Sequence, residues 1–176
     1  MKISTIITQL EEWAPIALQE SYDNSGLLVG DCNADINAAL LCLDSIEEVI
    51  EEAIERKCGM VIAHHPIVFS GIKSLTGKNY IERTLLKAIK NNIAIYAIHT
   101  NLDNVKNGVN KKIAEKIGLQ NLEILSPKSG KLNKLVFFCP LNDSEGVKVA
   151  LFQAGAGAIG DYDYCSFSTE GEGTFR

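Results

Sequence analysis

Three short apolar runs constrain the fold of this chain more than any other feature. They cover residues 38–43, 60–63 and 93–98. Each run is about as long as one buried strand. Segments with apolar residues at helical spacing alternate with them, at residues 46–54, 80–89 and 109–117. This alternation predicts an α/β layer fold with a largely parallel sheet flanked by helices. The run 38–43 is apolar on both faces, so we expect helices on both sides of it.

A first helix over residues 3–14 and a short strand over 27–30 are predicted before these runs. The polar segment 23–26 between them is interpreted as a turn and not as a ligand loop. The composition becomes polar and turn-rich near residues 126–131, which places a domain boundary there. We therefore expect one domain over residues 1–127 and a second over 131–176. The second domain is predicted as a strand, a helix and a strand, at residues 135–140, 144–154 and 162–168.

Composition excludes several classes of function. The net charge of −5 over 176 residues argues against a nucleic-acid partner, although Lys73, Lys78 and Arg83 could meet one anionic ligand. No apolar stretch approaches the roughly 20 residues that span a bilayer, and no export signal is visible. The five cysteines share no close spacing, which predicts reduced thiols and a cytoplasmic protein without membrane contact.

Polar side chains follow the apolar runs where each predicted strand ends. His64 and His65 follow the second run, and His99 and Asp103 follow the third. Ligands of open α/β sheets bind beyond the carboxyl ends of the strands, so these side chains should converge there. Imidazole and carboxylate together suit Zn²⁺, Fe²⁺, Mn²⁺ or Co²⁺. The sequence therefore predicts a metal site at this edge of the sheet.

The adjacency of His64 and His65 suggests one histidine per ion. Pro66 biases His65 toward an extended backbone, so we expect the two side chains to diverge. Asp103 has two carboxylate oxygens and could bridge a pair of ions roughly 3.5–4 Å apart. His99 remains open as a ligand, as a partner of a ligand, or as a proton carrier, which its ordinary pKa suits.

Asp44 follows the first apolar run and has two explanations. It could belong to the site, because it too lies at a strand end. It could instead lie near a helix N-terminus, where the helix dipole favours a carboxylate. The second explanation is the one we favour from the sequence.

Three motifs resemble a known family. They are residues 23–30 (DNSGLLVG), 63–69 (AHHPIVF) and 99–103 (HTNLD). In this order they are similar to the NIF-three-like family of dinuclear metal centre proteins, also called GTP cyclohydrolase one type two homologues. The resemblance covers residues 1 to about 125. Residues 155–176 resemble the start of an inserted ferredoxin-like domain, so we expect the sequence to be truncated within that insert.

The resemblance implies a site and an assembly. His64 and His65 would each bind one of two divalent ions, of zinc, iron or manganese, and Asp103 would bridge them. The family completes its site with a further His and a Glu from a C-terminal half, and this sequence has no fourth histidine. Members form ring-shaped homohexamers, which implies self-association here.

Two functions follow as hypotheses. The first is a metal-dependent hydrolase acting on a nucleotide or phosphorylated small molecule, with His99 as the catalytic proton carrier. The second is a non-enzymatic metal-binding or regulatory scaffold that works through its oligomer. Metal bound without turnover of nucleotide substrates would favour the second.

Overall fold

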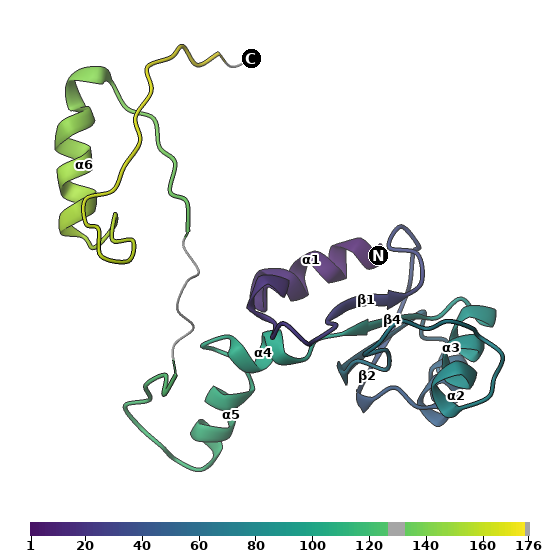
Figure 1. The fold of residues 1–176 in the computed structure, drawn as a ribbon. Helices are drawn as coiled ribbons and strands as arrows, with labels where there is room; N and C mark the ends of the chain where they lie inside the picture. The colour runs from purple at the N-terminus through teal and green to yellow at the C-terminus, as the bar shows by residue number, and fades with distance from the viewer. Residues whose placement is uncertain (127–132, 175–176) are drawn as a thin grey trace. The chain divides into compact units, whose positions relative to one another are not determined.

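The computed structural model describes residues 1–126 and 133–174 (Figure 1). The contacts divide the chain into two units, Met1–Ile124 and Leu125–Arg176. The domain limits predicted from the sequence, at 127 and 131, fall on residues outside the described ranges and stay a prediction. Each unit is described below by itself.

The first unit is built on one four-stranded sheet. Its strands are β1 (Gly26–Val29), β2 (Ala39–Asp44), β3 (Met60–His65) and β4 (Ala94–Ala97). Their order across the sheet is β1-β4-β3-β2. The strands β2, β3 and β4 are parallel, and β1 pairs antiparallel to β4 at one edge. The predicted α/β class with a largely parallel sheet and flanking helices is confirmed.

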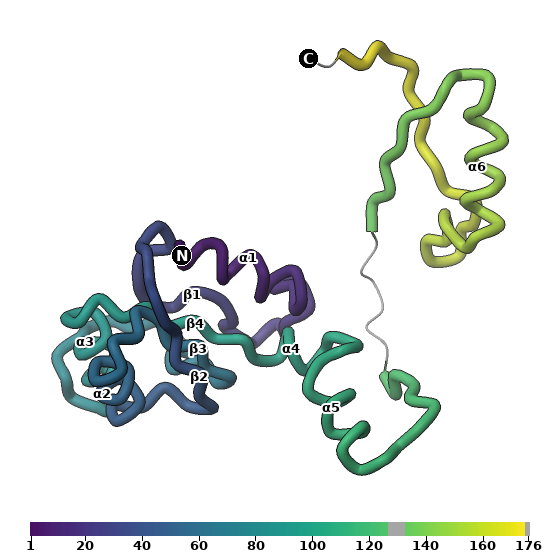
Figure 2. Tube along the Cα trace, turned by 180° about the vertical axis from the view of Figure 1, so that it is seen from behind, coloured from purple at the N-terminus to yellow at the C-terminus, as the bar shows by residue number. Residues whose placement is uncertain are grey.

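Helices cover the two faces of the sheet unequally. The helices of this unit are α1 (Ile3–Trp13), the 3₁₀ turn η1 (Ile16–Leu18), α2 (Glu47–Glu55), α3 (Tyr80–Lys90), α4 (Thr100–Asn104) and α5 (Val109–Lys116). Both views place α1 on one side of the sheet and α2 with α3 on the other (Figures 1 and 2). Val61 and Ile95 pack against α2 and α3, whereas Met60 and Tyr96 pack against α1. This alternation along each strand is what the pleat requires.

The strand β2 differs from its prediction. One face of β2, opposite to α2 and α3, is not covered by any of the described residues. Leu41 and Leu43 lie on this face and are 74% and 60% exposed. The reason is geometric. A helix is about 10 Å wide, whereas four strands spaced about 4.8 Å apart span about 14 Å. The single helix α1 therefore covers the middle of its face and leaves the edge strand open, so the expectation of helices on both sides of β2 is wrong.

The second unit contains one long helix, α6 (Ser144–Gln153), preceded by the 3₁₀ turn η2 (Leu141–Asp143). The helix predicted for this region is thus present. The strands predicted at 135–140 and 162–168 are not, and the described part of this unit pairs backbone only at one isolated bridge, Ile159 with Tyr162. A strand needs a hydrogen-bonded neighbour, and a segment of this size offers little core against which to form one.

The parallel strands bring their carboxyl ends to one edge of the sheet. Asp44 at the end of β2 is the register partner of His65 at the end of β3. The backbone N–H of Ile98, just past β4, donates to Ala63 of β3 at 2.9 Å. The polar residues after the strands therefore start from neighbouring positions. No helix within the described ranges is long and apolar enough to cross a membrane.

Candidate metal centre

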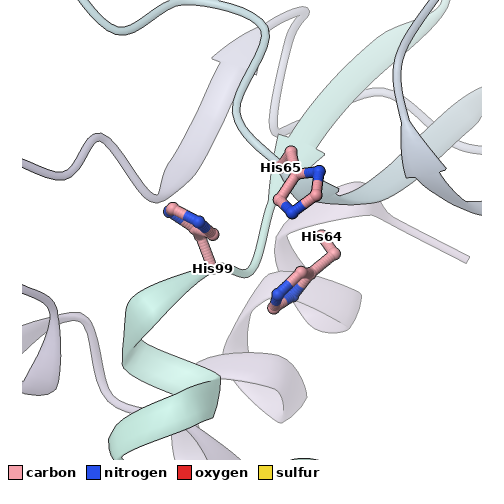
Figure 3. A group of neighbouring side chains, drawn as sticks. All are labelled: His64, His65 and His99. Atoms are coloured by element: carbon pink, nitrogen blue, oxygen red, sulfur yellow. The ribbon is translucent and has the colours of Figure 1, made fainter.

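The three histidines of the chain lie together (Figure 3). His64 and His65 come from the end of β3, and His99 comes from the segment that enters α4. The imidazole centroids are 5.0 to 5.5 Å apart, and one nitrogen from each ring lies within 4.8 Å of the others. The convergence predicted from the strand ends is therefore present for these three residues.

Each imidazole has the same nitrogen engaged. Nδ1 of His64 donates to the backbone carbonyl of Ile98 at 2.9 Å, and Nδ1 of His65 donates to Asp44 at 2.8 Å. Nδ1 of His99 donates to Asp23 at 2.8 Å. Carbonyls and ionised carboxylates only accept hydrogen bonds, so each Nδ1 carries the proton. Nε2 is then left with its lone pair on all three rings, which is the form that binds a metal ion.

Asp23 is a buried carboxylate with five hydrogen-bond donors around it. Its side chain is 0% exposed. Besides His99, it accepts hydrogen bonds from the backbone N–H and hydroxyl of Thr100, the hydroxyl of Ser25 and the backbone N–H of Asn24. Burial alone would raise the pKa of Asp23, but these hydrogen bonds outweigh it and lower the pKa from 3.8 to about 2. Asp23 is therefore an anion that fixes the His99 ring.

The expectation that His64 and His65 diverge is wrong. Their ring centroids are 5.0 Å apart, and both rings lie with His99 in one group. Adjacent side chains of a strand alternate between the two faces of the sheet. His64 and His65 are the last two residues of β3, so no further residue of that strand lies between the two rings.

Asp103 and Asp44 lie at two different sides of the cluster. Asp103 is on α4, and its carboxylate oxygen is 3.9 Å from Nε2 of His64, which is an ion-pair contact and not a hydrogen bond. It is not one of the groups whose ligand atoms already lie within 4.8 Å of one another. Asp44 accepts a hydrogen bond from the His65 ring, which supports the site explanation of Asp44 over the helix-terminus explanation that we favoured.

The sequence reasoning missed Asp23, which we interpreted as part of a turn. The antiparallel pairing of β1 with β4 places Gly26 opposite Ala97, so residues before β1 lie beside the residues after β4. Asp23 reaches His99 for this reason. The available signal was the motif DNSG directly before a predicted strand. The direction of that strand in the sheet, however, cannot be read from the residues around the motif.

The donor set fits a divalent metal ion. In a tetrahedral zinc site with Zn–N bonds of about 2.0–2.1 Å, the nitrogens are about 3.4 Å apart. The ligand nitrogens of the three histidines are up to 4.8 Å apart, which is somewhat wider. Small rotations of the rings would bring them to one ion, and the present spacing also suits two ions that share the cluster. The hydrogen bonds at Nδ1 match the supporting contacts that orient metal-binding histidines.

Comparison with known proteins places these features in a family context. The family model Duf34/NIF3 (NGG1p interacting factor 3) matches residues 1–169. A GTP cyclohydrolase 1 type 2 homolog from Halalkalibacterium halodurans is 43% identical over 180 residues, covering 100% of this chain and 48% of the relative. A protein of the same name from Bacillus subtilis is 41% identical, covering 97% of this chain and 46% of the relative. The chain thus spans about half the length of these curated relatives.

Two solved structures extend the comparison. A Bacillus cereus protein related to NIF3 superposes with a TM-score of 0.70 at 40% identity, over 99% of this chain and 49% of that one. Reduced HcgD from Methanocaldococcus jannaschii superposes with a TM-score of 0.64 at 37% identity, over 69% of this chain and 48% of that one. The layered arrangement around the histidines is therefore shared with proteins of known structure.

Proposed function

This chain belongs to the Duf34/NIF3 family, and on that premise we propose that its histidine cluster binds divalent metal ions. One observation carries the proposal. All three imidazoles have Nδ1 occupied by an acceptor, and their ligand nitrogens lie within 4.8 Å of one another. Imidazoles that keep Nε2 free of a hydrogen bond and gather at this spacing are a group from which the ligands of a divalent cation can come.

We assign the ligands as His64, His65 and Asp103. His64 already lies 3.9 Å from Asp103 through Nε2, so both can reach one ion with small side-chain movements. His65 donates its Nδ1 hydrogen bond to Asp44, and its Nε2 can serve a second ion. We propose two ions of zinc, iron or manganese, with Asp103 between them.

His99 is proposed as the proton carrier. Asp23 accepts the hydrogen bond of its Nδ1–H, while Nε2 remains available to take a proton. This is the arrangement by which a buried carboxylate orients a catalytic histidine. His99 therefore accepts or returns a proton without changing its tautomer at Nδ1.

With this set of residues we propose a hydrolase that acts on a nucleotide or another phosphorylated small molecule. A bound divalent ion would supply Lewis acidity and lower the pKa of a water molecule. The residues of the chain orient the ligands and move the proton. The name of the relatives, GTP cyclohydrolase 1 type 2 homolog, makes GTP the first substrate to test.

A non-enzymatic scaffold is the alternative, and the open face of β2 favours it. Leu41 and Leu43 expose apolar side chains on an edge strand, a surface that associating subunits can cover. Self-association, up to the homohexamer expected from the resemblance, is thus part of the proposal. Sedimentation of the purified chain measures it directly, and a monomer at all concentrations would contradict it.

Elemental analysis tests metal binding. The purified chain is incubated with Zn²⁺, Fe²⁺ or Mn²⁺, dialysed, and compared with His64→Ala and Asp103→Ala variants. We expect bound metal in the parent chain and a loss of most of it in both variants. Asp35→Ala is the matched control, because its carboxylate is 74% exposed and distant in sequence from the cluster. Absence of metal in the parent chain, or equal metal in all four proteins, would contradict the site.

Turnover is tested on the metal-loaded chain with GTP, by the absorbance change on opening of the purine ring. Metal bound at full stoichiometry without turnover of GTP or other nucleotides would favour the scaffold alternative.

A further inference from the structure

A cavity of about 700 Å³ opens beside the histidine cluster. It lies between the ends of β2 and β3, the loop 66–74 and the first turn of α3, and Asp44 and His65 form part of its wall. Cavities of roughly 300–1,000 Å³ are the size that small-molecule ligands occupy. The proposed metal centre therefore faces a space large enough for a substrate.

The charged side chains on the cavity wall differ in whether they have a partner within the protein. The carboxylate of Asp44 accepts the Nδ1 proton of His65. The carboxylate of Glu82 accepts backbone N–H bonds from Thr76 at 2.8 Å and Lys78 at 3.1 Å. Both acids thus have their charge engaged within the protein.

Lys73 is the exception. It is the one lysine or arginine among the cavity-lining residues, and its ammonium pairs with no residue in the described part of the chain. Lys73 is therefore the cation that the cavity offers to an anionic ligand. An anionic group, above all a phosphate with its several acceptor oxygens, satisfies such a cation.

Two aromatic side chains also line the cavity. Phe69 and Tyr80 line it and are 55% and 54% exposed. The ring of Phe69 also packs edge-on against His99, with centroids 5.9 Å apart, which connects this wall to the histidine cluster. The loop is anchored nearby, because Nδ2 of Asn24 donates to the carbonyl of Val68 at 2.7 Å. An exposed ring on an anchored loop, with a second exposed ring at the start of α3, suits a ligand with a planar ring.

We propose that this cavity binds a small-molecule phosphate that carries a planar ring, with the anionic group at Lys73 and the ring against Tyr80. The inference rests on the proposed function to the extent that the reacting part of the ligand lies at the histidine cluster. It adds where such a ligand is held beside the histidine cluster and names Lys73 and Tyr80 as specificity-determining residues.

Three probes separate the parts of this recognition. Phenylphosphonate carries both the ring and the anion and has no ester bond to hydrolyse, inorganic phosphate carries the anion alone, and benzamide carries the ring alone. Calorimetry with the zinc-loaded 176-residue chain is expected to show phenylphosphonate binding about tenfold more tightly than either partial probe. Equal affinity for phenylphosphonate and inorganic phosphate would overturn the role of the ring.

Lys73→Met removes the charge and keeps the length of the side chain. We expect it to weaken phenylphosphonate binding about tenfold, as for the loss of one charged hydrogen bond. Lys78→Met is the matched control, since Lys78 also lies between β3 and α3 but does not line the cavity. Unchanged binding in Lys73→Met, or equal weakening in both variants, would overturn the inference. Tyr80→Leu should weaken the binding of phenylphosphonate and leave the binding of inorganic phosphate unchanged. Unchanged binding of phenylphosphonate with weaker binding of inorganic phosphate would contradict the ring contact.

Zinc content measured on the same samples separates this inference from the metal proposal. Lys73→Met should retain zinc at the level of the parent chain. If zinc binds and Lys73 proves irrelevant to phenylphosphonate, the cavity assignment alone fails. If the parent chain binds no zinc and still binds phenylphosphonate through Lys73, the metal proposal fails and the cavity assignment stands.

Discussion

Asp23 accepts a hydrogen bond from Nδ1 of His99 at 2.8 Å, although 76 positions separate the two residues in the sequence. The carboxylate is fully buried and remains ionised through the hydrogen bonds that surround it. A buried anion placed against an imidazole fixes the ring and its tautomer. The contact therefore connects the stability of the fold to the geometry of the proposed site.

Asp23→Asn should destabilise the protein. The amide presents an NH₂ group where Asp23 accepts hydrogen bonds from Thr100 and Ser25, so donors would face donors in a buried position. We expect a loss of about 1–3 kcal/mol in the free energy of unfolding, measured by urea denaturation. The exposed Asp35→Asn is the control and should change stability by no more than about 0.5 kcal/mol. Equal effects of the two substitutions would contradict the role of Asp23.

The metal-free chain should lose stability in acid because of the same carboxylate. The pKa of Asp23 is about 2 in the folded chain against 3.8 as its ordinary value, so the unfolded chain binds the proton more readily. This contribution, on the order of 2 kcal/mol, is present above about pH 4 and is lost as the pH falls toward 2. Denaturation midpoints across this range measure it. The Asp23→Asn variant should show a shallower slope, and an identical slope would exclude Asp23 as the cause.

Asp44→Ala should weaken metal binding without removing a ligand. The substitution frees Nδ1 of His65, so the ring loses its fixed orientation and tautomer. Supporting carboxylates of this kind contribute about 10–100-fold to metal affinity. Competition with a zinc chelator measures the change. Asp31→Ala, an exposed carboxylate that bonds only its neighbour Asn33 in the described structure, should leave the affinity unaltered. A similar fall in metal affinity in both variants would point to the change in net charge as the cause.

His99→Gln separates the roles of the three histidines. If His99 carries protons, the variant should retain metal at the level of the parent chain, whereas His64→Gln and His65→Gln should lose it. Elemental analysis of the three dialysed variants gives the comparison. Loss of metal from His99→Gln would instead make His99 a ligand.

Gly30→Ala should destabilise the sheet at the edge formed by β1. Gly30 has φ of +110°, and an added Cβ would lie 2.7 Å from the Cβ of Ala94 and 2.8 Å from its Cα. Both the backbone conformation and the close approach to β4 exclude a side chain, so we expect a loss of at least about 2 kcal/mol. Thermal unfolding measures it. Gly71→Ala is the control, because no atom lies within 4 Å of its added Cβ. A tolerated Gly30→Ala would contradict the packing of β1 on β4.

Local sequence patterns were sufficient for most elements of the first unit. The run 60–63 predicted β3, and residues 80–89 predicted α3, which the structure places at Met60–His65 and Tyr80–Lys90. Apolar periodicity is a property of neighbouring residues, so it can be recognised without knowing the fold. The same patterns failed at 135–140 and 162–168, where the described structure forms no strand.

The sequence by itself determined that the three histidines meet at one edge of the sheet, because His64, His65 and His99 each follow an apolar run that forms a strand. Only the tertiary structure decided their partners. The order β1-β4-β3-β2 and the antiparallel direction of β1 bring Asp23 to His99, and the parallel register of β2 with β3 brings Asp44 to His65. A hydrogen bond depends on distance through space. That distance is set by strand order and direction, which no local pattern of residues contains.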